Sequence, residues 1–244
     1  LDSLLPLYKR WGLKGIKFGF VQIGNQHWST WLHDAVRKCG EYEMMVDIHD
    51  EYRPTGFSRT YPNLMTQEGI RGNEEMPDAT HNTILPFTRF LAGAADYTLC
   101  YFNGRVKNTK AHQLAMAAVY YSPLQFMFYK GEEELEFWKA IPSVWDDSRA
   151  LDGEIGEYII QARRSGNDWF VGAMTNTEAR TVTVMTDFLE PGKKYTAHLY
   201  EDDDKLNTGT KVRTAHKKVK AGDKLILKLK ASGGAALHFT PIEK

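Results

Sequence analysis

Apolar positions in the first part of the chain alternate between strand-like runs and helical periodicity. Continuous apolar runs at Gly15–Val21 and Glu43–His49 alternate with segments at Leu4–Trp11 and Trp28–Cys39 whose apolar residues recur every three or four positions. This pattern predicts parallel strands joined by helices. The same pattern predicts three further strands and two further helices: strands at Leu64–Gln67, Asp96–Phe102 and Leu124–Tyr129, and helices at Lys107–Tyr121 and Glu132–Ala140.

The pattern changes after Asp146. Short β-rich runs then recur about every ten residues, with turn-forming sequences between them, a spacing typical of an antiparallel sandwich or barrel. The runs are Glu157–Arg163, Trp169–Thr175, Thr181–Met185, Tyr195–Tyr200, Val212–Val219, Lys224–Leu229 and Ala235–Thr240. We therefore predict two domains, a strand–helix domain at residues 1–146 and a C-terminal β-sandwich at residues 147–244.

The strand–helix domain is too short for a closed barrel. It contains about five predicted strands, whereas a (β/α)₈ barrel has eight. We expect the C-terminal half of such a barrel, with an open parallel edge at residues 15–21, which would need the missing N-terminal half to fold stably. The first residue is Leu1 and not Met, which fits a chain that starts partway through a longer protein.

Composition and charge exclude several classes of function. The 244 residues carry 31 Lys+Arg and 31 Asp+Glu, a formal net charge of zero, so we expect neither a nucleic-acid partner nor an anionic-membrane partner, because both require a basic surface. No apolar run approaches the ~18 residues of a membrane span. Two cysteines are too few for a disulfide framework or a cysteine-rich zinc site.

Polar residues follow the predicted strands, where the active sites of barrel enzymes lie. His49 and Asp50 end the second strand, and Glu68, Arg71 and Glu74 follow the third. Several carboxylates in one dry pocket cannot all remain ionised without compensation. Either one carboxyl keeps its proton and serves as a general acid, or a cation lies among the carboxylates.

Four sequence blocks resemble glycoside hydrolase family 97. They are Asp-Ile-His-Asp-Glu-Tyr-Arg-Pro-Thr-Gly at 47–56, Ser-Arg-Thr-Tyr-Pro-Asn-Leu at 58–64, Gln-Glu-Gly-Ile-Arg-Gly-Asn-Glu at 67–74 and Leu-Pro-Phe-Thr-Arg at 85–89. The resemblance implies a calcium-dependent, exo-acting α-glycosidase whose catalytic barrel lies between two β-sandwich domains. It also implies an exported, periplasmic protein that acts on an oligosaccharide with a terminal α-linked galactose or glucose. The chain would then supply half of the barrel and the C-terminal sandwich, and the missing N-terminal half of the barrel and the N-terminal β-sandwich would be its structural partners.

The resemblance also implies roles for individual residues. Glu74 matches the general acid, and Glu68 matches a Ca²⁺ ligand. Asp50 lies where inverting members have a glutamate that acts as base and calcium neighbour, so Asp50 and Glu74 join Glu68 as expected metal ligands. His49 matches a histidine near the sugar, and we place Arg71 with it as a substrate-binding residue.

One position departs from the family pattern. Retaining members resemble Lys-x-Asp-Phe on the first strand, where the aspartate is the nucleophile, and this chain has Lys17-Phe18-Gly19-Phe20. Two interpretations remain open. The chain belongs either to an inverting α-glucosidase with an unusual base or to a retaining α-galactosidase whose nucleophile position holds Gly19, and we favour the second. A non-catalytic carbohydrate-binding protein is a third alternative.

Overall fold

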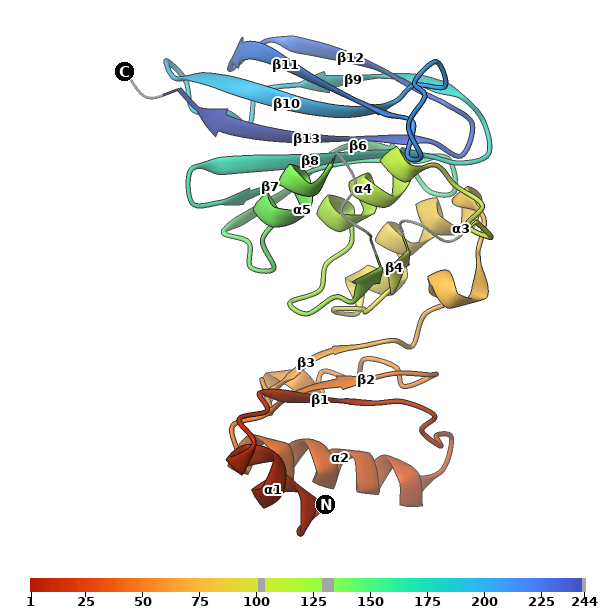
Figure 1. Cartoon of the computed structure of the whole chain (residues 1–244), viewed down its shortest axis with the longest axis vertical. Helices are drawn as coiled ribbons and strands as arrows, with labels where there is room; N and C mark the ends of the chain where they lie inside the picture. The colour runs from red at the N-terminus through yellow and green to blue at the C-terminus, as the bar shows by residue number, and fades with distance from the viewer. Residues whose placement is uncertain (101–103, 129–133, 243–244) are drawn as a thin grey trace.

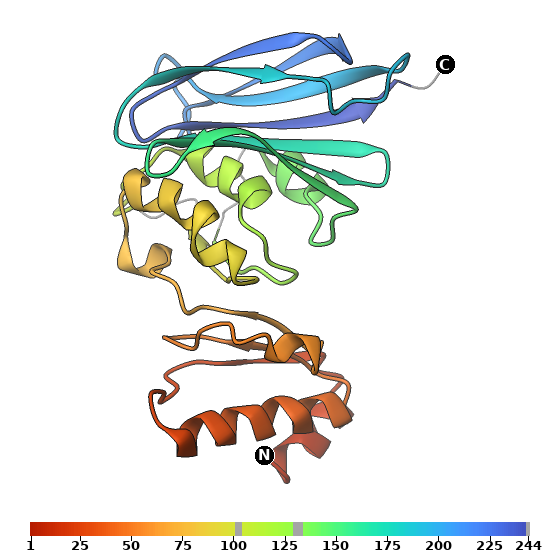
Figure 2. The same cartoon turned by 180° about the vertical axis from the view of Figure 1, so that it is seen from behind.

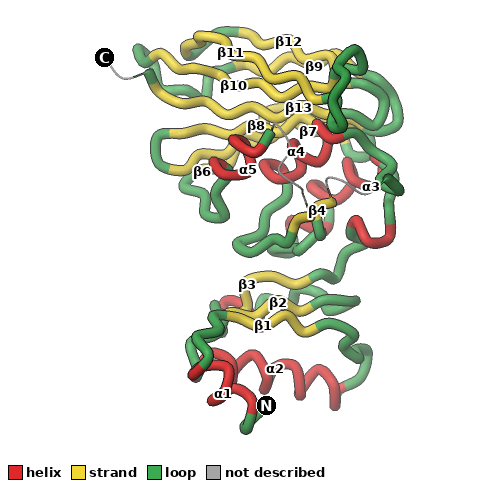
Figure 3. Tube along the Cα trace, in the orientation of Figure 1, coloured by secondary structure: helices red, strands yellow, loops and turns green. Residues whose placement is uncertain are grey.

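A computed structural model of the chain describes residues 1–100, 104–128 and 134–242. Figure 1 shows three regions along the longest axis: an N-terminal sheet with two helices, a mainly helical middle region and a C-terminal region of long antiparallel strands. Figure 3 shows the same division by secondary structure, with strands concentrated at the C-terminal end. Within the described residues, no helix combines the length and the apolar character needed to cross a bilayer.

The N-terminal region is a parallel sheet with helices on one face (Figure 1). It contains α1 (Leu4–Arg10), β1 (Gly15–Phe18), α2 (Gln26–Glu41), β2 (Met45–Ile48) and β3 (Leu64–Gln67), and its strand order is β1-β2-β3. Val46 and Ile48 pack with Leu32 and Val36 of α2 in one buried cluster. Side chains alternate along a strand, so Asp47 and His49 lie on the opposite face of the sheet from α2.

The middle region contributes two more parallel strands. β4 (Leu99–Cys100) pairs with β5 (Met127–Phe128), and the N–H of Asp96 donates to the carbonyl oxygen of Gln67, which links this pair to β3. The helices are α3 (Ala79–Ile84), α4 (Lys110–Val119) and α5 (Leu135–Ala140). The predicted parallel strand–helix segment of a partial barrel is therefore confirmed. Residues 101–103 and 129–133, which carry parts of the fourth and fifth predicted strands and of the last predicted helix, lie outside the described residues.

Strand β1 is an open edge. Among the described residues it pairs only with β2, in parallel register from Gly15 opposite Met45 to Phe18 opposite Ile48. Beyond the strand, the side chain of Phe20 is 99% exposed. The predicted open edge is confirmed, although the strand ends at Phe18 and not at Val21.

The C-terminal region contains eight antiparallel strands in two sheets. A six-stranded sheet has the order β11-β10-β13-β8-β7-β6, and β12 pairs with β9. The strands are β6 (Asp147–Glu154), β7 (Tyr158–Ser165), β8 (Asp168–Thr175), β9 (Arg180–Met185), β10 (Lys194–Asp202), β11 (Val212–Lys220), β12 (Lys224–Leu229) and β13 (Gly234–Pro241). Leu225, Leu227 and Leu229 of β12 share a buried core with Val171 and Leu237 of the larger sheet, which confirms the predicted antiparallel sheet region.

Strand β6 was not predicted. Its sequence, Asp-Ser-Arg-Ala-Leu-Asp-Gly-Glu, has almost no apolar alternation, and most of its residues are exposed. It forms because it pairs with β7 from Asp147 to Glu154. This strand depends on hairpin pairing with the next strand along the chain and not on burial of its own side chains.

The helical region and the six-stranded sheet share one hydrophobic core. Leu114 and Met116 of α4 lie in the same buried cluster as Phe170, Tyr200 and Ala236 of the sheet, and Figure 2 shows the helices against the face of the sheet that points toward the N-terminal region. The division into domains at Asp146 stays a prediction.

Candidate active site

A polar cavity lies where β2 and β3 end. It has a volume of about 540 Å³. Its lining residues come from the two segments after these strands: Asp50, Glu51, Arg53, Glu68, Gly69, Ile70, Arg71, Glu74 and Glu75. The carboxyl ends of parallel barrel strands are the usual position of an active site. The cavity is lined by Asp50, Glu68 and Glu74, the acidic residues that were predicted at these strand ends.

Glu68 is the buried carboxylate of this cavity, with 9% exposure. Its Oε2 accepts a hydrogen bond from the main-chain N–H of Asp50 at 2.5 Å and lies 3.2 Å from Nδ1 of His49. The N–H of Glu68 donates to the carbonyl oxygen of Ile48 on β2. The backbone of Glu68 is therefore held by β2, and its side chain is held by the two residues that follow β2.

His49 connects Glu68 to a second group of acidic residues. Its Nε2 lies 2.7 Å from Oδ2 of Asp96 and 3.5 Å from Oδ2 of Asp47. Burial opposes the charged imidazolium, but hydrogen bonds to Asp96 and Glu68 and the charge of Asp47 outweigh it and raise the pKa of His49 to about 10. In this arrangement, both ring nitrogens of His49 carry a proton, and His49 donates one N–H to Glu68 and the other to Asp96.

Asp50 occupies a constrained backbone position with φ +65°, in the left-handed region. Its Oδ2 accepts a hydrogen bond from the N–H of Val21 at 2.7 Å. Asp50 thus joins the segment after β1 to the end of β2, and its backbone N–H contacts Glu68 at the same time.

Glu74 comes to the cavity from a short 3₁₀ turn at Asn73–Glu75. The N–H of Asn73 donates to the carbonyl oxygen of Tyr97, which fixes this turn against the segment before β4. Glu74 is exposed, so its carboxyl group is open to a ligand in the cavity.

The carboxylates of Glu68 and Glu74 converge with His49. One potential ligand atom from each of these three residues lies within 4.8 Å of the other two. Ca²⁺ is bound by six to eight oxygen atoms, so Glu68 and Glu74 fit as oxygen ligands and His49 fits better as the hydrogen-bond donor that orients Glu68. Asp50 does not belong to this group, although it borders the same cavity.

Arg71 and Gly19 occupy peripheral positions. Arg71 is exposed and lines the cavity. Gly19 is exposed just beyond β1 and is not a lining residue, and a Cβ atom added at Gly19 would meet no other atom within 4 Å. The structure therefore leaves room for a side chain at position 19.

Sequence reasoning did not assign a role to three residues that organise the site: Asp47, Arg89 and Asp96. Asp47 and Asp96 are almost fully buried on the Nε2 side of His49. Arg89 donates to the carbonyl oxygens of Gln67, Glu68 and Gly69 at the end of β3. Asp47 and Arg89 belong to the family-like blocks, and that was the signal available in the sequence.

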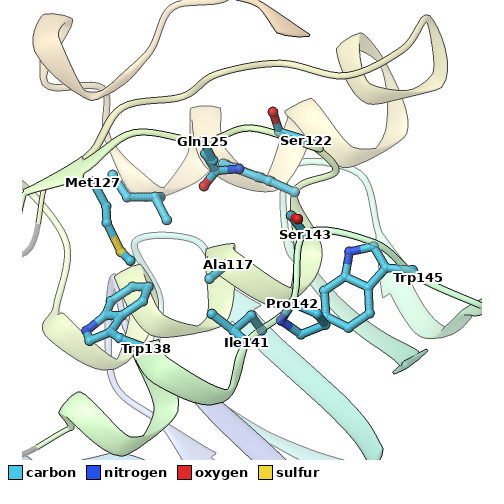
Figure 4. A pocket seen from close by; sticks show the side chains of 11 residues that line it. Ala117, Ser122, Gln125, Met127, Trp138, Ile141, Pro142, Ser143 and Trp145 are labelled. Atoms are coloured by element: carbon cyan, nitrogen blue, oxygen red, sulfur yellow. The ribbon is translucent and has the colours of Figure 1, made fainter. Parts of the chain in front are cut away.

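A second cavity, of about 130 Å³, lies between α4, α5 and the β4–β5 pair (Figure 4). Trp138 and Trp145 line it together with Ser122, Gln125 and Met127. It has no acidic or histidine side chain among its lining residues, so it is not the candidate active site.

Comparison with known proteins gave matches to both ends of the chain. A family profile described as glycoside hydrolase 97 matches residues 1–70, and one described as glycosyl-hydrolase 97 C-terminal, oligomerisation, matches residues 144–240. A retaining alpha-galactosidase of Bacteroides thetaiotaomicron is 32% identical over 98% of this chain and 40% of its own length. A probable retaining alpha-galactosidase of Streptomyces bingchenggensis is 32% identical over 75% of this chain and 30% of its own length.

The solved structures include similar folds. A glycoside hydrolase family 97 enzyme from Pseudoalteromonas sp. strain K8, in complex with acarbose, has a TM-score of 0.86 and 31% identity, and the match covers 99% of this chain and 44% of that enzyme. A β-arabinopyranosidase has a TM-score of 0.83 and 25% identity over 97% of this chain.

The fold and the cavity define a class. The parallel strand–helix part and the antiparallel β region of this chain match the fold of the family 97 enzyme, and carboxylates lie at the strand ends of the parallel part. The chain belongs to glycoside hydrolase family 97. It spans 40% of the length of the Bacteroides relative.

Proposed function

We propose that this protein is a calcium-dependent, exo-acting α-glycosidase for terminal α-galactosides, built on the retaining mechanism, with Gly19 at the nucleophile position. The observation that carries the proposal is the polar cavity at the strand ends, which Glu68 and Glu74 line together, with His49 next to both carboxylates. Two relatives described as retaining or probable retaining alpha-galactosidases, each 32% identical, support the choice of substrate.

Glu74 is the general acid of this proposal. It is exposed to the cavity on a turn that is anchored to Tyr97, so a glycosidic oxygen can come within hydrogen-bonding reach of its carboxyl group. Proton transfer from Glu74 to that oxygen would allow the sugar–oxygen bond to break without releasing an alkoxide. Arg71, which lines the cavity, would bind hydroxyl groups of the sugar, and His49 would act on the substrate through Glu68, because both of its ring nitrogens are occupied.

Glu68, Glu74 and Asp50 would hold Ca²⁺. The bound ion would neutralise the crowded carboxylates and polarise the substrate. His49 orients Glu68, and the N–H of Asp50 holds the same oxygen of Glu68. These contacts leave the second oxygen of Glu68 available as a ligand.

Gly19 determines how far the reaction proceeds. A retaining glycosidase needs a carboxylate nucleophile about 5–5.5 Å from the general acid. Gly19 has no side chain, so no covalent glycosyl-enzyme can form at this position. Substrate would bind, and turnover would be slow.

Restoring the carboxylate tests the proposal. The variant Gly19→Asp, assayed on an activated aryl α-galactoside with Ca²⁺, should hydrolyse it at least about 100-fold faster than the wild type. Gly209→Asp is the matched control, since position 209 is also open to solvent, and it should leave the rate unchanged. An equal rate in Gly19→Asp and the wild type would contradict the assignment of Gly19.

Azide, an external nucleophile, provides a second test of the role of Gly19. In the wild type, azide should attack the anomeric carbon in the open space at Gly19 while the glycosidic C–O bond breaks and Glu74 protonates the leaving group. The product would be a glycosyl azide of inverted configuration. Glu74→Gln should prevent this on a substrate whose leaving group needs protonation.

An inverting α-glucosidase is the second candidate. Family 97 enzymes of Pseudoalteromonas sp. strain K8, 31% identical to this chain, have been solved with acarbose and with panose. In this alternative Asp50, next to the segment after β1, would act as the base. Good wild-type activity on an α-glucoside, an inverted product and no response to azide would establish it. No hydrolysis by the wild type or by Gly19→Asp would favour the non-catalytic carbohydrate-binding alternative.

A further inference from the structure

His49 separates two groups of carboxylates. Its Nδ1 faces Glu68 at 3.2 Å, on the side of the proposed active site. Its Nε2 faces Asp96 at 2.7 Å and Asp47 at 3.5 Å, on the other side. The proposed glycosidase mechanism uses the first side only, and the second side has no assigned role.

Asp47 is a buried carboxylate that lacks a hydrogen-bond donor. It is 1% exposed, and neither of its oxygens accepts a hydrogen bond from the described part of the chain. Asp47 lies in β2 and His49 directly follows this strand two residues later, so both side chains point to the face opposite α2. A buried carboxylate in this state requires a cation or a proton for compensation.

Two cationic groups lie near Asp47, but neither donates a hydrogen bond to it, and the nearer one, Nε2 of His49, is 3.5 Å from its Oδ2. Lys17 is opposite Asp47 in the strand register, yet its Nζ lies 3.9 Å from Oδ2 of Asp96 and sits over the ring of Phe126. Asp96 is held firmly, because its Oδ1 accepts hydrogen bonds from the N–H groups of Phe126 and Thr98. Its Oδ2 is thereby directed at His49.

These three residues have the geometry of a metal-ligand set. One ligand atom each from Asp47, His49 and Asp96 lies within 4.8 Å of the other two, and all three residues are buried. Ligand bonds of ~2.0–2.2 Å hold neighbouring ligand atoms roughly 3–3.5 Å apart, close to the separations of 2.7 and 3.5 Å from Nε2. The side chains of Asp47, His49 and Asp96 would therefore need to move little to bind a metal ion.

We propose that Asp47, His49 and Asp96 form a second metal site, for a small divalent transition-metal ion such as Zn²⁺. An imidazole nitrogen with two carboxylates suits such ions, whereas Ca²⁺ prefers ligands that are all oxygen. Two carboxylates balance the two positive charges of the ion, and the ion would be the cation that compensates the buried carboxylate of Asp47. This proposal does not depend on the glycosidase activity.

The same geometry supplies the outer contact that histidine ligands usually have. With the metal on Nε2, His49 keeps its proton on Nδ1 and donates it to Oε2 of Glu68, the arrangement in which a carboxylate orients a metal-bound imidazole. Binding would release the Nε2 proton to solvent. Glu68 would then be a ligand of Ca²⁺ and the hydrogen-bond acceptor of the metal-bound His49, without being a ligand of the second metal ion.

Cobalt titration of the protein tests the site. The chain is stripped with a chelator, supplied with excess Ca²⁺ and titrated with Co²⁺, whose visible absorption reports its coordination, and Zn²⁺ is then added as competitor. We expect one Co²⁺ equivalent that Zn²⁺ displaces. Asp47→Asn and Asp96→Asn should each weaken binding by more than the roughly 10–100-fold that loss of an outer contact costs.

Two control variants separate this site from other histidine clusters. Glu74→Gln alters only the proposed calcium group, and His198→Ala alters a row of histidines on β10, β11 and β13 in which His198 is flanked by His216 and His238. Both should bind Co²⁺ like the wild type. Loss of binding in either control, full binding in Asp47→Asn, or no Co²⁺ absorption by the wild type would overturn the proposal.

A crystal of the wild type avoids any dependence on how the variants fold. After a zinc soak, an anomalous scattering peak bonded to Asp47, His49 and Asp96 would support the site. A peak elsewhere, or no peak, would overturn it.

Discussion

Nη2 of Arg89 donates a hydrogen bond to the main-chain oxygen of Glu68 at 2.9 Å, although the two residues are 21 positions apart in the sequence. The same guanidinium donates to the carbonyl oxygens of Gln67 and Gly69, and to those of Gly93 and Ala94 before β4. Burial lowers the pKa of Arg89 to about 10, so it remains charged at neutral pH. Arg89 therefore holds the end of β3 in the shape that presents Glu68 to the cavity.

Arg89→Met should destabilise the protein. The substitution keeps an unbranched side chain but leaves several carbonyl oxygens without their charged donor, and we expect the free energy of unfolding to fall by about 2–4 kcal/mol. Urea denaturation measures this change. Arg213→Met is the control, because Arg213 pairs with Glu201 at the surface, and its effect should stay within about 0.5 kcal/mol. Equal effects of the two substitutions would contradict the role of Arg89.

Gly172→Ala should separate α4 from the six-stranded sheet. A Cβ at position 172 would lie 2.3 Å from the carbonyl oxygen of Ala115, a backbone atom that cannot move without shifting the helix. We expect a loss of about 1–3 kcal/mol in the free energy of unfolding, measured by thermal or urea denaturation. Gly209→Ala, where an added Cβ meets no atom within 4 Å, should be close to neutral. A neutral Gly172→Ala would show that this close approach does not limit packing.

Much of the fold could be predicted because its signals are local. The β3 bounds, Leu64–Gln67, agree with the prediction, and α2 extends the predicted helix by only two residues at each end. The helix starts earlier because Asn25 caps it by accepting a hydrogen bond from the N–H of Trp28. In contrast, β6 could not be predicted, since its polar sequence becomes a strand only when β7 pairs with it.

The site contains residues with a signal in the sequence and residues that are identified only by contacts between distant parts of the chain. Glu68, Glu74 and His49 lie in sequence blocks that resemble a family, and the structure brings them together. Asp96 is 47 residues from His49, and Arg89 is 21 residues from Glu68. Neither contact leaves a periodic or compositional signal, and although Arg89 lies in a family-like block, the partners of both residues are defined only when the strands are assembled.

Calcium should stabilise the protein through Glu68. If the ion binds the folded state only, its addition raises the midpoint of thermal unfolding, by the equivalent of about 2.7 kcal/mol at 100 times the dissociation constant. A chelator should reverse the shift, and Glu68→Gln should abolish most of it. Glu190→Gln, at a surface ion pair with Lys193, should respond to calcium like the wild type. A full calcium response in Glu68→Gln would exclude Glu68 as a ligand.

His112 should make the joint between α4 and the C-terminal sheet sensitive to acid. It is fully buried, its Nδ1–H donates to the carbonyl oxygen of Gly233, and its Nε2 accepts from the side-chain amide of Asn82, so the imidazole is neutral. Burial lowers its pKa to about 4, with a smaller opposing effect of the Gly233 bond.

The folded pKa of His112 lies below the ~6.5 of an unfolded chain, so its contribution is complete above pH ~6.5 and is lost as the pH falls toward 4. Between these values the unfolded state binds about one more proton, which reduces the free energy of unfolding by ~1.4 kcal/mol per pH unit. Urea denaturation from pH 4 to 7.5 should show this slope in the wild type, and His112→Gln should show a slope lower by about one proton. His216→Gln, at an exposed position on β11, should retain the wild-type slope. An unchanged slope in His112→Gln would mean that other groups cause the acid sensitivity.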